Sequence, residues 1–306
     1  MPIKIPNSLP AVQTLKKERV PLILESRALK QDIRPLQIAI LNLMPDKIKT
    51  ETQLLRAMGA SPLQIEITLL HTSTHQSKNT PEDHLSSFYA THDDVKDKRF
   101  DGLIVTGAPL GLVDYKDVTY WDELATIMDW SRRHVYGSFY ICWGALAALY
   151  HFHGIEKTVL DSKKMGVFLC HARDVFDPLT MGFDDLFHTP IARHTAIARK
   201  DILHRPALDI LAETEDGDPC LLQDTSLRHV YALSHLEYDA ETLKNEYERN
   251  IAEGINPDLP ENYFPGDNPA ATPRMTWRAH RSLLFRNWVD TIYQGTPFNL
   301  DEIEPV

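Results

Sequence analysis

The first half of the chain alternates between short apolar runs and longer segments in which apolar residues recur at helical spacing. The apolar runs predict buried strands at 36–43, 63–70, 101–106 and 137–142. The longer segments predict helices that begin near Asp46, at a Thr80 cap followed by Pro81, at Tyr120 and at Trp143. This alternation is typical of an α/β domain with a mainly parallel sheet.

The pattern weakens after Leu149. Residues 154–201 are expected to form irregular or antiparallel excursions with a strand at 165–170, and a late strand is expected at 229–234. A charged helix follows from Asp239 to about Gly254, and a last helix covers 276–294. The proline-rich segment between these helices, 256–273, is predicted to be an ordered surface loop anchored by Tyr263 and Phe264.

These elements predict one α/β domain over residues 36–298. Residues 1–35 are expected to form an N-terminal extension packed on the core, and residues 299–306 a short acidic tail in solvent. With 306 residues and 43% hydrophobic composition, the chain is long and apolar enough to bury a substantial core.

Charge and cysteine content narrow the class of partner. A net charge of -11 argues against nucleic acid and against an anionic membrane surface as partners. Three widely spaced cysteines suggest neither a disulfide framework nor a structural zinc site, and the histidine pairs lack further ligands, so no metal is expected. No apolar stretch approaches the length of a membrane span, and the N-terminus does not resemble a signal peptide. We therefore expect a cytoplasmic protein.

Cys142 ends an apolar run and is followed at once by Trp143-Gly144-Ala145, the start of a helix of small and apolar residues. A thiol at such a turn faces unpaired N–H groups and the positive end of the helix dipole, which stabilise a thiolate. Taken alone, Cys142 is equally well explained as a buried core cysteine.

His235 and Glu237 supply the partners that a nucleophilic Cys142 needs. Residues two apart on a strand share a face, so the carboxylate of Glu237 can hold one imidazole nitrogen of His235. Both Cys142 and His235 are expected at the carboxyl ends of strands, where α/β sheets place their chemistry. The sequence thus predicts a nucleophile, a general base and an orienting acid.

Nearby groups could complete the site. The N–H of Trp143, and that of Leu110 in the turn after the strand at 101–106, are the candidate oxyanion donors, because Pro109 has no N–H. Cations close to strand ends could receive a carboxylate or phosphate-bearing ligand; these are Lys47, Lys49, Lys163, Lys164 and Arg193.

Taken together, the motifs resemble the homoserine O-succinyltransferase and O-acetyltransferase family of methionine biosynthesis. The resemblance covers nearly the whole chain. It rests on Ala39-Ile40-Leu41-Asn42-Leu43-Met44-Pro45, Gly107-Ala108-Pro109, Cys142-Trp143-Gly144-Ala145, His235-Leu236-Glu237-Tyr238, Asn262-Tyr263-Phe264 and Leu283-Leu284-Phe285 with Asn287-Trp288. It implies the fold of the class I glutamine amidotransferase domain, a flavodoxin-like three-layer α/β sandwich.

The resemblance also implies a two-step acyl transfer. Cys142 would take the acyl group from acyl-CoA as a thioester, and the side-chain hydroxyl of L-homoserine would then attack it. His235 would act as the base, Glu237 would orient it, and Lys47 would add positive potential near the nucleophile. Acyl-CoA would be a co-substrate with no bound cofactor, and the family makes a homodimer the expected assembly.

Substrate specificity is implied at further positions. Lys163, Ala192, Arg193 and Arg249 match the family's amino-acid-binding positions. The family ties acyl choice to position 111, where a small residue such as Gly111 favours succinyl and an acidic one favours acetyl.

Two departures concern the acceptor. The usual His-Ser-Arg is Ile191-Ala192-Arg193 here, which removes a hydroxyl, and Leu236 adds bulk after His235. L-serine, shorter by one methylene, is therefore an alternative acceptor, in which case acetyl becomes the expected acyl group. Alternatives from other classes are a glutamine-hydrolysing amidotransferase and a non-catalytic binding or redox protein that uses Cys142 as a sensor.

Overall fold

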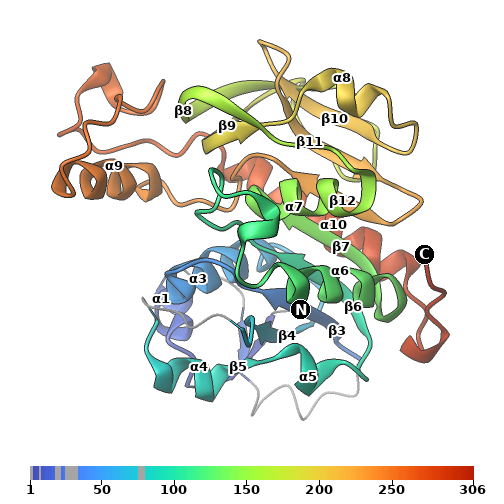
Figure 1. The fold of residues 1–306 in the computed structure, drawn as a ribbon. Coiled ribbons are helices and arrows are strands. Elements are labelled where there is room, and N and C mark those ends of the chain that lie inside the picture. Colours follow the sequence, from blue (N-terminus) through green and yellow to red (C-terminus); the bar gives the residue numbers. More distant parts are fainter. Residues whose placement is uncertain (1–2, 7, 18–21, 25–33, 75–79) are drawn as a thin grey trace.

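The computed structural model describes residues 3–6, 8–17, 22–24, 34–74 and 80–306. These residues form one large mixed sheet with helices on both faces (Figure 1). The strands are β1 (Ile3–Ile5), β2 (Leu22–Leu24), β3 (Leu36–Leu41), β4 (Ile65–Leu70), β5 (Tyr89–Ala90), β6 (Phe100–Val105), β7 (Val135–Ile141), β8 (Thr158–Ala172), β9 (Leu186–Ala196), β10 (Asp209–Thr214), β11 (Pro219–Asp224) and β12 (His229–Ala232). The helices are α1 (Ala11–Lys17), α3 (Lys47–Met58), α4 (Glu82–Phe88), α5 (His92–Val95), α6 (Trp121–His134), α7 (Trp143–His153), α8 (Arg199–Leu203), α9 (Thr242–Ala252) and α10 (Arg278–Gly295).

The strand order is β2-β1-β4-β3-β6-β7-β12-β11-β10-β8-β9, with β5 paired to β4. From β2 to β12 neighbouring strands run parallel, and beyond β12 every pairing is antiparallel. The predicted mainly parallel sheet is confirmed. Because β6, β7 and β12 are parallel neighbours, the loops that follow them meet at one edge of the sheet.

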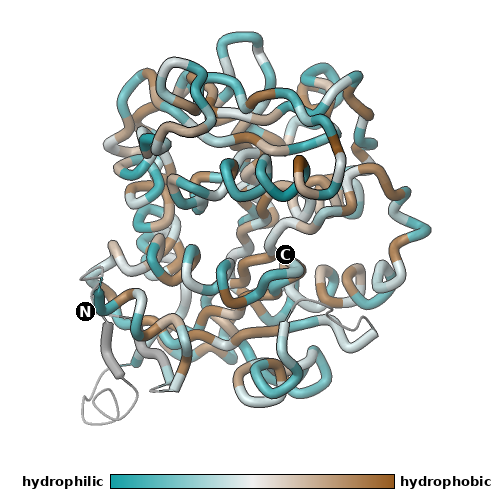
Figure 2. The backbone as a smooth tube through the Cα atoms, turned by 90° about the vertical axis from the view of Figure 1, so that its left-hand side faces the viewer, coloured by the Kyte–Doolittle hydropathy of each residue, from teal (hydrophilic) through white to brown (hydrophobic). Residues whose placement is uncertain are grey.

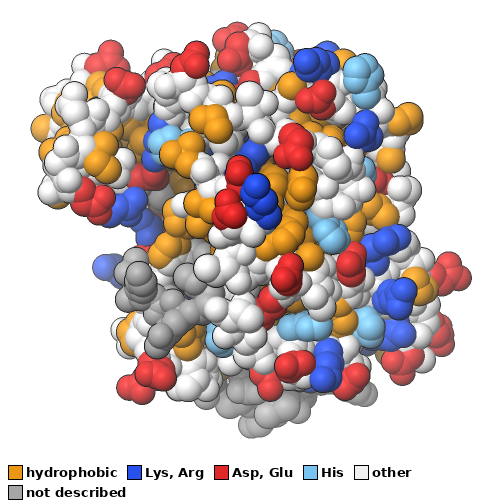
Figure 3. All heavy atoms as spheres, in the orientation of Figure 1, with side chains coloured by type: hydrophobic (Ala, Val, Ile, Leu, Met, Phe, Trp, Pro, Cys, Tyr) orange, Lys and Arg blue, Asp and Glu red, His pale blue; other side chains and the backbone are white. Residues whose placement is uncertain are grey.

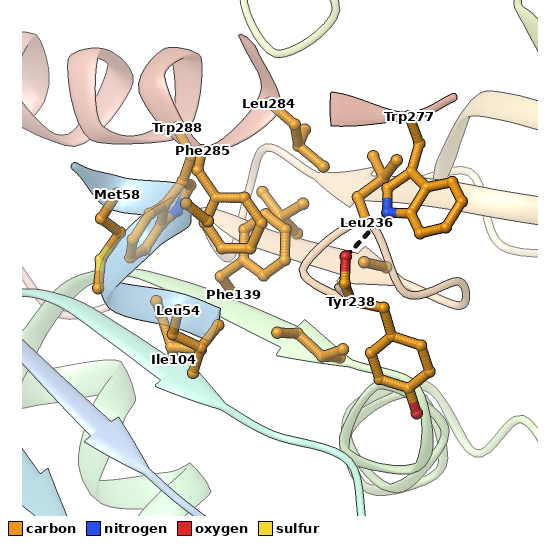
Figure 4. Close-up of a cluster of buried hydrophobic side chains, with 14 of the residues drawn as sticks. Leu54, Met58, Ile104, Phe139, Leu236, Tyr238, Trp277, Leu284, Phe285 and Trp288 are labelled. Carbon is orange, nitrogen blue, oxygen red and sulfur yellow. Dashed lines mark hydrogen bonds between the residues drawn. The ribbon is translucent and has the colours of Figure 1, made fainter. Parts of the chain in front are cut away.

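Alternate side chains of the central strands pack against opposite helical layers. Ile104 and Phe139 belong to the cluster that includes Leu54 and Met58 of α3 and Leu284, Phe285 and Trp288 of α10, part of which is drawn in Figure 4. Leu103, Val105 and Tyr140 belong to the cluster on the α6 and α7 side. Each strand is therefore buried on both faces, which explains why the strands read as near-continuous apolar runs. Figure 2 shows these hydrophobic segments concentrated in the interior.

Most predicted elements of the parallel half form close to their expected bounds, but the Thr80 cap is wrong. Helix α4 begins at Glu82 with Pro81 before it, and the Thr80 side chain makes no cap. Its hydroxyl instead donates to the carbonyl of Pro45 at 3.0 Å, in the loop after β3. Because the Thr80 hydroxyl makes this tertiary hydrogen bond, it does not cap α4.

The antiparallel half is more regular than expected. Strand β8 spans 15 residues and pairs with β9, so the expected strand at 165–170 is only its central part. Strands β10 and β11 were not predicted, although Asp216-Gly217 between them is a hairpin signal. The exposed first half of β8 lacks the apolar pattern that identifies buried strands.

The loop at 256–273 is ordered, as predicted, because Tyr263 and Phe264 are buried in the core cluster. The acidic side chains of the tail, Asp301, Glu302 and Glu304, are exposed, but the tail is also attached to the core. Ile303 is buried, and the backbone N–H of Val306 donates to the carbonyl of Arg132 at 3.0 Å. At the other end of the chain, β1 pairs with β4, so the described N-terminal residues extend the sheet. In the part of the chain that the structure describes, no helix has the length and apolarity to cross a membrane.

Candidate active site

Cys142 lies at a strained turn between β7 and α7. Its backbone has φ 49° and ψ −114°, in the positive-φ region that side-chain-bearing residues rarely adopt. The conformation is held from both sides, because the Cys142 N–H donates to Ala232 at 2.7 Å and its carbonyl accepts from Leu146 at 3.0 Å. The thiol is thus presented at the carboxyl edge of the sheet, at the N-terminus of α7, as the sequence predicted.

Gly144 lets α7 start immediately after this turn. A Cβ at this position would lie 2.6 Å from the carbonyl oxygen of Thr106 and 3.0 Å from that of Val105. Both atoms are backbone and cannot rotate away. The first turn of α7 therefore packs against the end of β6 at a distance that only glycine allows.

His235 and Glu237 lie together in the turn just beyond β12. The Nδ1 atom of His235 is 2.6 Å from a carboxylate oxygen of Glu237, and both side chains are buried. The backbone N–H of His235 donates to Pro190 of β9 at 2.8 Å, which fixes the turn. The predicted contact is confirmed, although the pair sits in a turn rather than on a strand.

Tyr238 is a neighbour that sequence reasoning did not assign. Its ring stacks on the imidazole of His235 at 4.0 Å between centroids, and its hydroxyl is 3.3 Å from Nε2. The Tyr238 carbonyl accepts from the indole of Trp277 at 2.9 Å, which ties the turn to the core (Figure 4). The only sequence signal was an aromatic residue three positions after His235.

Electrostatics favour a charged His235 next to Cys142. Burial alone would lower the pKa of His235, but the negative charges of Cys142 and Glu237, and hydrogen bonds to both side chains, raise it to about 10. A protonated His235 beside the sulfur can give its proton to a leaving group. This arrangement is the one expected for a nucleophile, a proton carrier and an orienting acid.

The thiol opens into a cavity of about 410 Å³. The cavity is built from the loop after β3, the turn after β6, strand β9 and helix α9. Its lining includes Met44, Gly107, Ala108, Cys142, Ala192, His235, Tyr238, Glu246 and Arg249. Among the described residues, no group of three His, Cys, Asp or Glu side chains is placed to hold a metal ion.

Comparison with known proteins shows to which family the chain belongs. The family model described as "Homoserine O-succinyltransferase" matches residues 2–298. The chain belongs to the homoserine O-succinyltransferase family. It is 52% identical over 308 residues to a homoserine O-acetyltransferase of Acetivibrio thermocellus, covering 99% of this chain and 100% of the relative. It is 50% identical to a homoserine O-acetyltransferase of Hyphomonas neptunium, with 99% of each chain covered.

Solved structures show the fold that this family member adopts. A glutamine amidotransferase of Thermotoga maritima superposes with a TM-score of 0.56 at 11% identity, over 86% of this chain and all of that one. A glutamine amidotransferase of Methylobacillus flagellatus gives 0.51 at 16% identity, over 86% and 94%. The predicted class I glutamine amidotransferase-like fold is confirmed, and the homoserine acyltransferase family makes the protein a transferase.

Ala192 and Arg193 of this homoserine O-succinyltransferase family member point to opposite sides of β9, because adjacent strand residues alternate. Ala192 lines the cavity. Arg193 is buried on the other side, paired with Asp218 and donating to the carbonyl of Leu233 at 3.4 Å. Arg193 is therefore not placed to contact a ligand in the cavity, contrary to the prediction.

The predicted cations occupy three different environments. Arg249 lies exposed on the cavity wall, and no ion pair joins it to another described residue. Lys163 forms an ion pair with Glu246, which also lines the cavity. Lys47 is buried behind the cavity and donates to the carbonyls of Asn42 and Met44, the latter at 3.3 Å.

Lys47 therefore braces the loop after β3, and its predicted effect on the thiol stays a prediction. Burial lowers its pKa to about 8, although the nearby carboxylate of Glu51 partly opposes this. Met44 of the braced loop lines the cavity, so Lys47 can act on the site through the position of that loop.

The predicted oxyanion donors differ in availability. Trp143 is the first residue of α7, where the N–H has no intrahelical acceptor. The N–H of Leu110 instead donates to the carbonyl of Ala108 at 2.8 Å. Because this N–H is already used, the hydrogen bond argues against the prediction that Leu110 is an oxyanion donor. Ala108 lines the cavity in the same turn, next to Gly107, and its N–H is the better second donor.

Gly111 and Leu236 lie outside the cavity lining. A Cβ at Gly111 would meet Thr195 Oγ1 at 3.5 Å and His194 Cβ at 3.7 Å on β9, which is ordinary contact distance. Leu236 is buried in the apolar cluster with Trp277 and Leu284 (Figure 4). The expectation that Leu236 makes the acceptor pocket shallower is wrong, because its side chain points into the core.

Proposed function

We propose that the protein transfers an acyl group from acyl-CoA to the side-chain hydroxyl of L-homoserine through a thioester on Cys142. The observation that carries the proposal is the hydrogen-bonded series Cys142, His235 and Glu237 at the mouth of a cavity, with Cys142 at the N-terminus of α7. Family membership supports homoserine as the acceptor.

In the first half-reaction, the Cys142 thiolate attacks the carbonyl carbon of the acyl thioester. The N–H groups of Trp143 and Ala108 stabilise the resulting oxyanion. As the carbon–sulfur bond to CoA breaks, the His235 imidazolium gives its proton to the departing CoA sulfur. The products are free CoA thiol, an acyl-Cys142 thioester and a neutral His235.

In the second half-reaction, neutral His235 takes the proton of the homoserine hydroxyl. The hydroxyl oxygen attacks the acyl carbon, and the carbon–sulfur bond to Cys142 breaks. This restores the thiolate and the imidazolium without any other acid or base. Glu237 keeps Nε2 of His235 aimed at the reacting atoms by accepting at Nδ1.

Charges on α9 fit an amino acid with both an ammonium and a carboxylate. Glu246 and Arg249 are three residues apart on this helix and line the same cavity, so they present opposite charges on one face. We assign the substrate carboxylate to Arg249 and its ammonium to Glu246. Lys163 then sets the position of Glu246 through their ion pair.

A second acceptor, L-serine, is favoured by one observation. Ala192 presents a methyl group to the cavity at the position where the family's usual serine would offer a hydroxyl. The assay also has to identify the acyl group that is transferred. The family description names succinyl transfer, whereas the relatives' descriptions name acetyl transfer. A cytoplasmic location and a homodimer stay predictions.

The test is a matrix of acetyl-CoA and succinyl-CoA against L-homoserine and L-serine, following release of CoA thiol. We expect one donor with L-homoserine to give the highest kcat/KM, and Cys142→Ala to abolish turnover. Highest turnover with L-serine would instead establish the second acceptor. Glutamine hydrolysis without any CoA release, or full activity in Cys142→Ala, would contradict the proposal.

A further inference from the structure

A second hollow, here called the basic groove, adjoins the candidate active site. It has a volume of about 780 Å³ and is lined by one side of α3 and by the first turns of α9 and α10. The groove and the Cys142 cavity share Lys49, Thr242 and Asn245 in their linings. A long ligand with its reactive end at Cys142 can therefore continue into this groove.

The groove concentrates positive charge on an acidic protein. Its lining carries four cations, Lys49, Arg56, Arg278 and Arg281, and only two carboxylates, whereas the whole chain has a net charge of -11. Figure 3 shows the molecule hollowed between the lobe that carries α9 and the part that carries α3, with Lys and Arg side chains beside the hollow. Anions are the ligands that such a surface favours.

One carboxylate organises two of these cations. Asp239 accepts from Arg56 at 2.6 Å and lies 3.8 Å from Arg281, so a single negative charge is shared by two guanidinium groups. Gln53 donates to the Asp239 carboxylate at 3.5 Å, and the backbone N–H of Asp239 donates to the Thr242 hydroxyl at 3.1 Å. The guanidinium groups are thus pre-positioned while the local charge stays positive.

Two helix N-termini add to this potential. Helices α9 and α10 are 11 and 18 residues long, and both begin at the groove. The first turn of a helix has unpaired N–H groups and carries the positive end of the dipole, which favours phosphate. Lys49 and Arg278 form no ion pair with other described residues, so their charges are available to a ligand.

We propose that the basic groove binds the phosphate groups of the acyl donor's nucleotide end, the diphosphate and 3′-phosphate of CoA. This rests on the proposed function, because it takes acyl-CoA as the donor. The pantetheine arm would pass the shared residues Lys49, Thr242 and Asn245 and bring the thioester to Cys142. Recognition of the donor would thus be separate from recognition of the amino acid at Arg249.

The test compares two donors with the same acyl group, acyl-CoA and acyl-pantetheine, which lacks the phosphate-bearing nucleotide. We expect Arg278→Gln and Arg278→Glu each to raise KM for acyl-CoA about tenfold or more, because each removes a charge-assisted contact to phosphate at a residue that lines the groove and not the Cys142 cavity. The KM for acyl-pantetheine and for L-homoserine should change less than twofold. Arg286→Gln is the matched control, since Arg286 is exposed on the same helix outside the groove lining.

Equal behaviour of the groove variants and Arg286→Gln with acyl-CoA would overturn the inference, and so would an equal loss with both donors. If the wild type used neither donor, the proposed function itself would fail, which is a different result. A second measurement needs no variant. The KM of the wild type for acyl-CoA should rise with ionic strength while that for acyl-pantetheine stays constant, and a rise that is the same for both donors would also overturn the inference.

Discussion

Replacing Gly144 with alanine tests the close packing on which the position of Cys142 depends. The new Cβ would lie 2.6 Å from the Thr106 carbonyl oxygen and 3.0 Å from that of Val105. In an open helix position, alanine would stabilise the fold by about 0.5–1 kcal/mol relative to glycine. Overpacking against fixed atoms costs about 1–3 kcal/mol, so the overlap should win. We expect a net loss of about 1–2 kcal/mol in the free energy of unfolding.

We expect the larger effect of Gly144→Ala to be on catalytic activity. Relief of the overlap requires α7 to move away from β6, and Cys142 is joined to the first turn of α7 by its hydrogen bond to Leu146. A displacement of about 1 Å at a reacting group lowers the rate roughly a hundredfold. The assays are urea denaturation followed by circular dichroism, and kcat/KM from release of CoA thiol.

Gly154→Ala is the control for this experiment. Gly154 caps the C-terminus of the same helix with φ +64°, and a Cβ added there would meet nothing within 4 Å, so alanine strains the backbone without any overlap. We expect a loss of about 1 kcal/mol from the φ requirement and wild-type kcat/KM. The reasoning would be refuted if Gly144→Ala were more stable than the wild type and fully active.

Four further predictions concern the site. Iodoacetamide should alkylate Cys142 much faster than the two buried thiols, and equal rates in the folded protein would remove the argument for an activated thiolate. Glu237 helps to raise the pKa of His235 to about 10, so Glu237→Gln should move the alkaline limb of the kcat/KM profile to lower pH. Glu82→Gln, on the exposed start of α4, is the control and should leave the limb where it is. An unmoved limb in Glu237→Gln would show that Glu237 does not act on His235. The raised pKa also stabilises the fold, fully below pH 6.5 and no longer above about pH 10, so Glu237→Gln should reduce that contribution, as urea denaturation at several pH values would show. Lys47→Met leaves the carbonyls of Asn42 and Met44 without their donor and should cost about 1–3 kcal/mol, with unchanged thermal unfolding as the contrary result.

The sequence predicted best what depends on local pattern. The parallel strands are buried on both faces and therefore appear in the sequence as apolar runs. The end of one such run at Cys142 predicted the turn before α7. The spacing of His235 and Glu237 anticipated their contact, although a turn rather than a strand brings them together. Strand β8 was underestimated because half of it is exposed and carries no apolar pattern.

What could not be predicted is which way a side chain faces. Arg193 follows a cavity-lining residue on β9, so its side chain points to the opposite side and forms an ion pair with Asp218. Leu236 follows His235 in a turn and enters the core. The N–H of Leu110 is taken by a local hydrogen bond. Each depends on register or turn geometry, which single positions in a sequence do not reveal.

The central claim is that Cys142 carries the acyl group. The direct test is to incubate the enzyme with acetyl-CoA or succinyl-CoA without any amino acid and to measure the mass of the intact protein and of the peptide containing Cys142. The account predicts a mass increase of one acyl group on that peptide, which disappears when L-homoserine is added. An unmodified Cys142 in an enzyme that still releases CoA thiol on adding L-homoserine would contradict it.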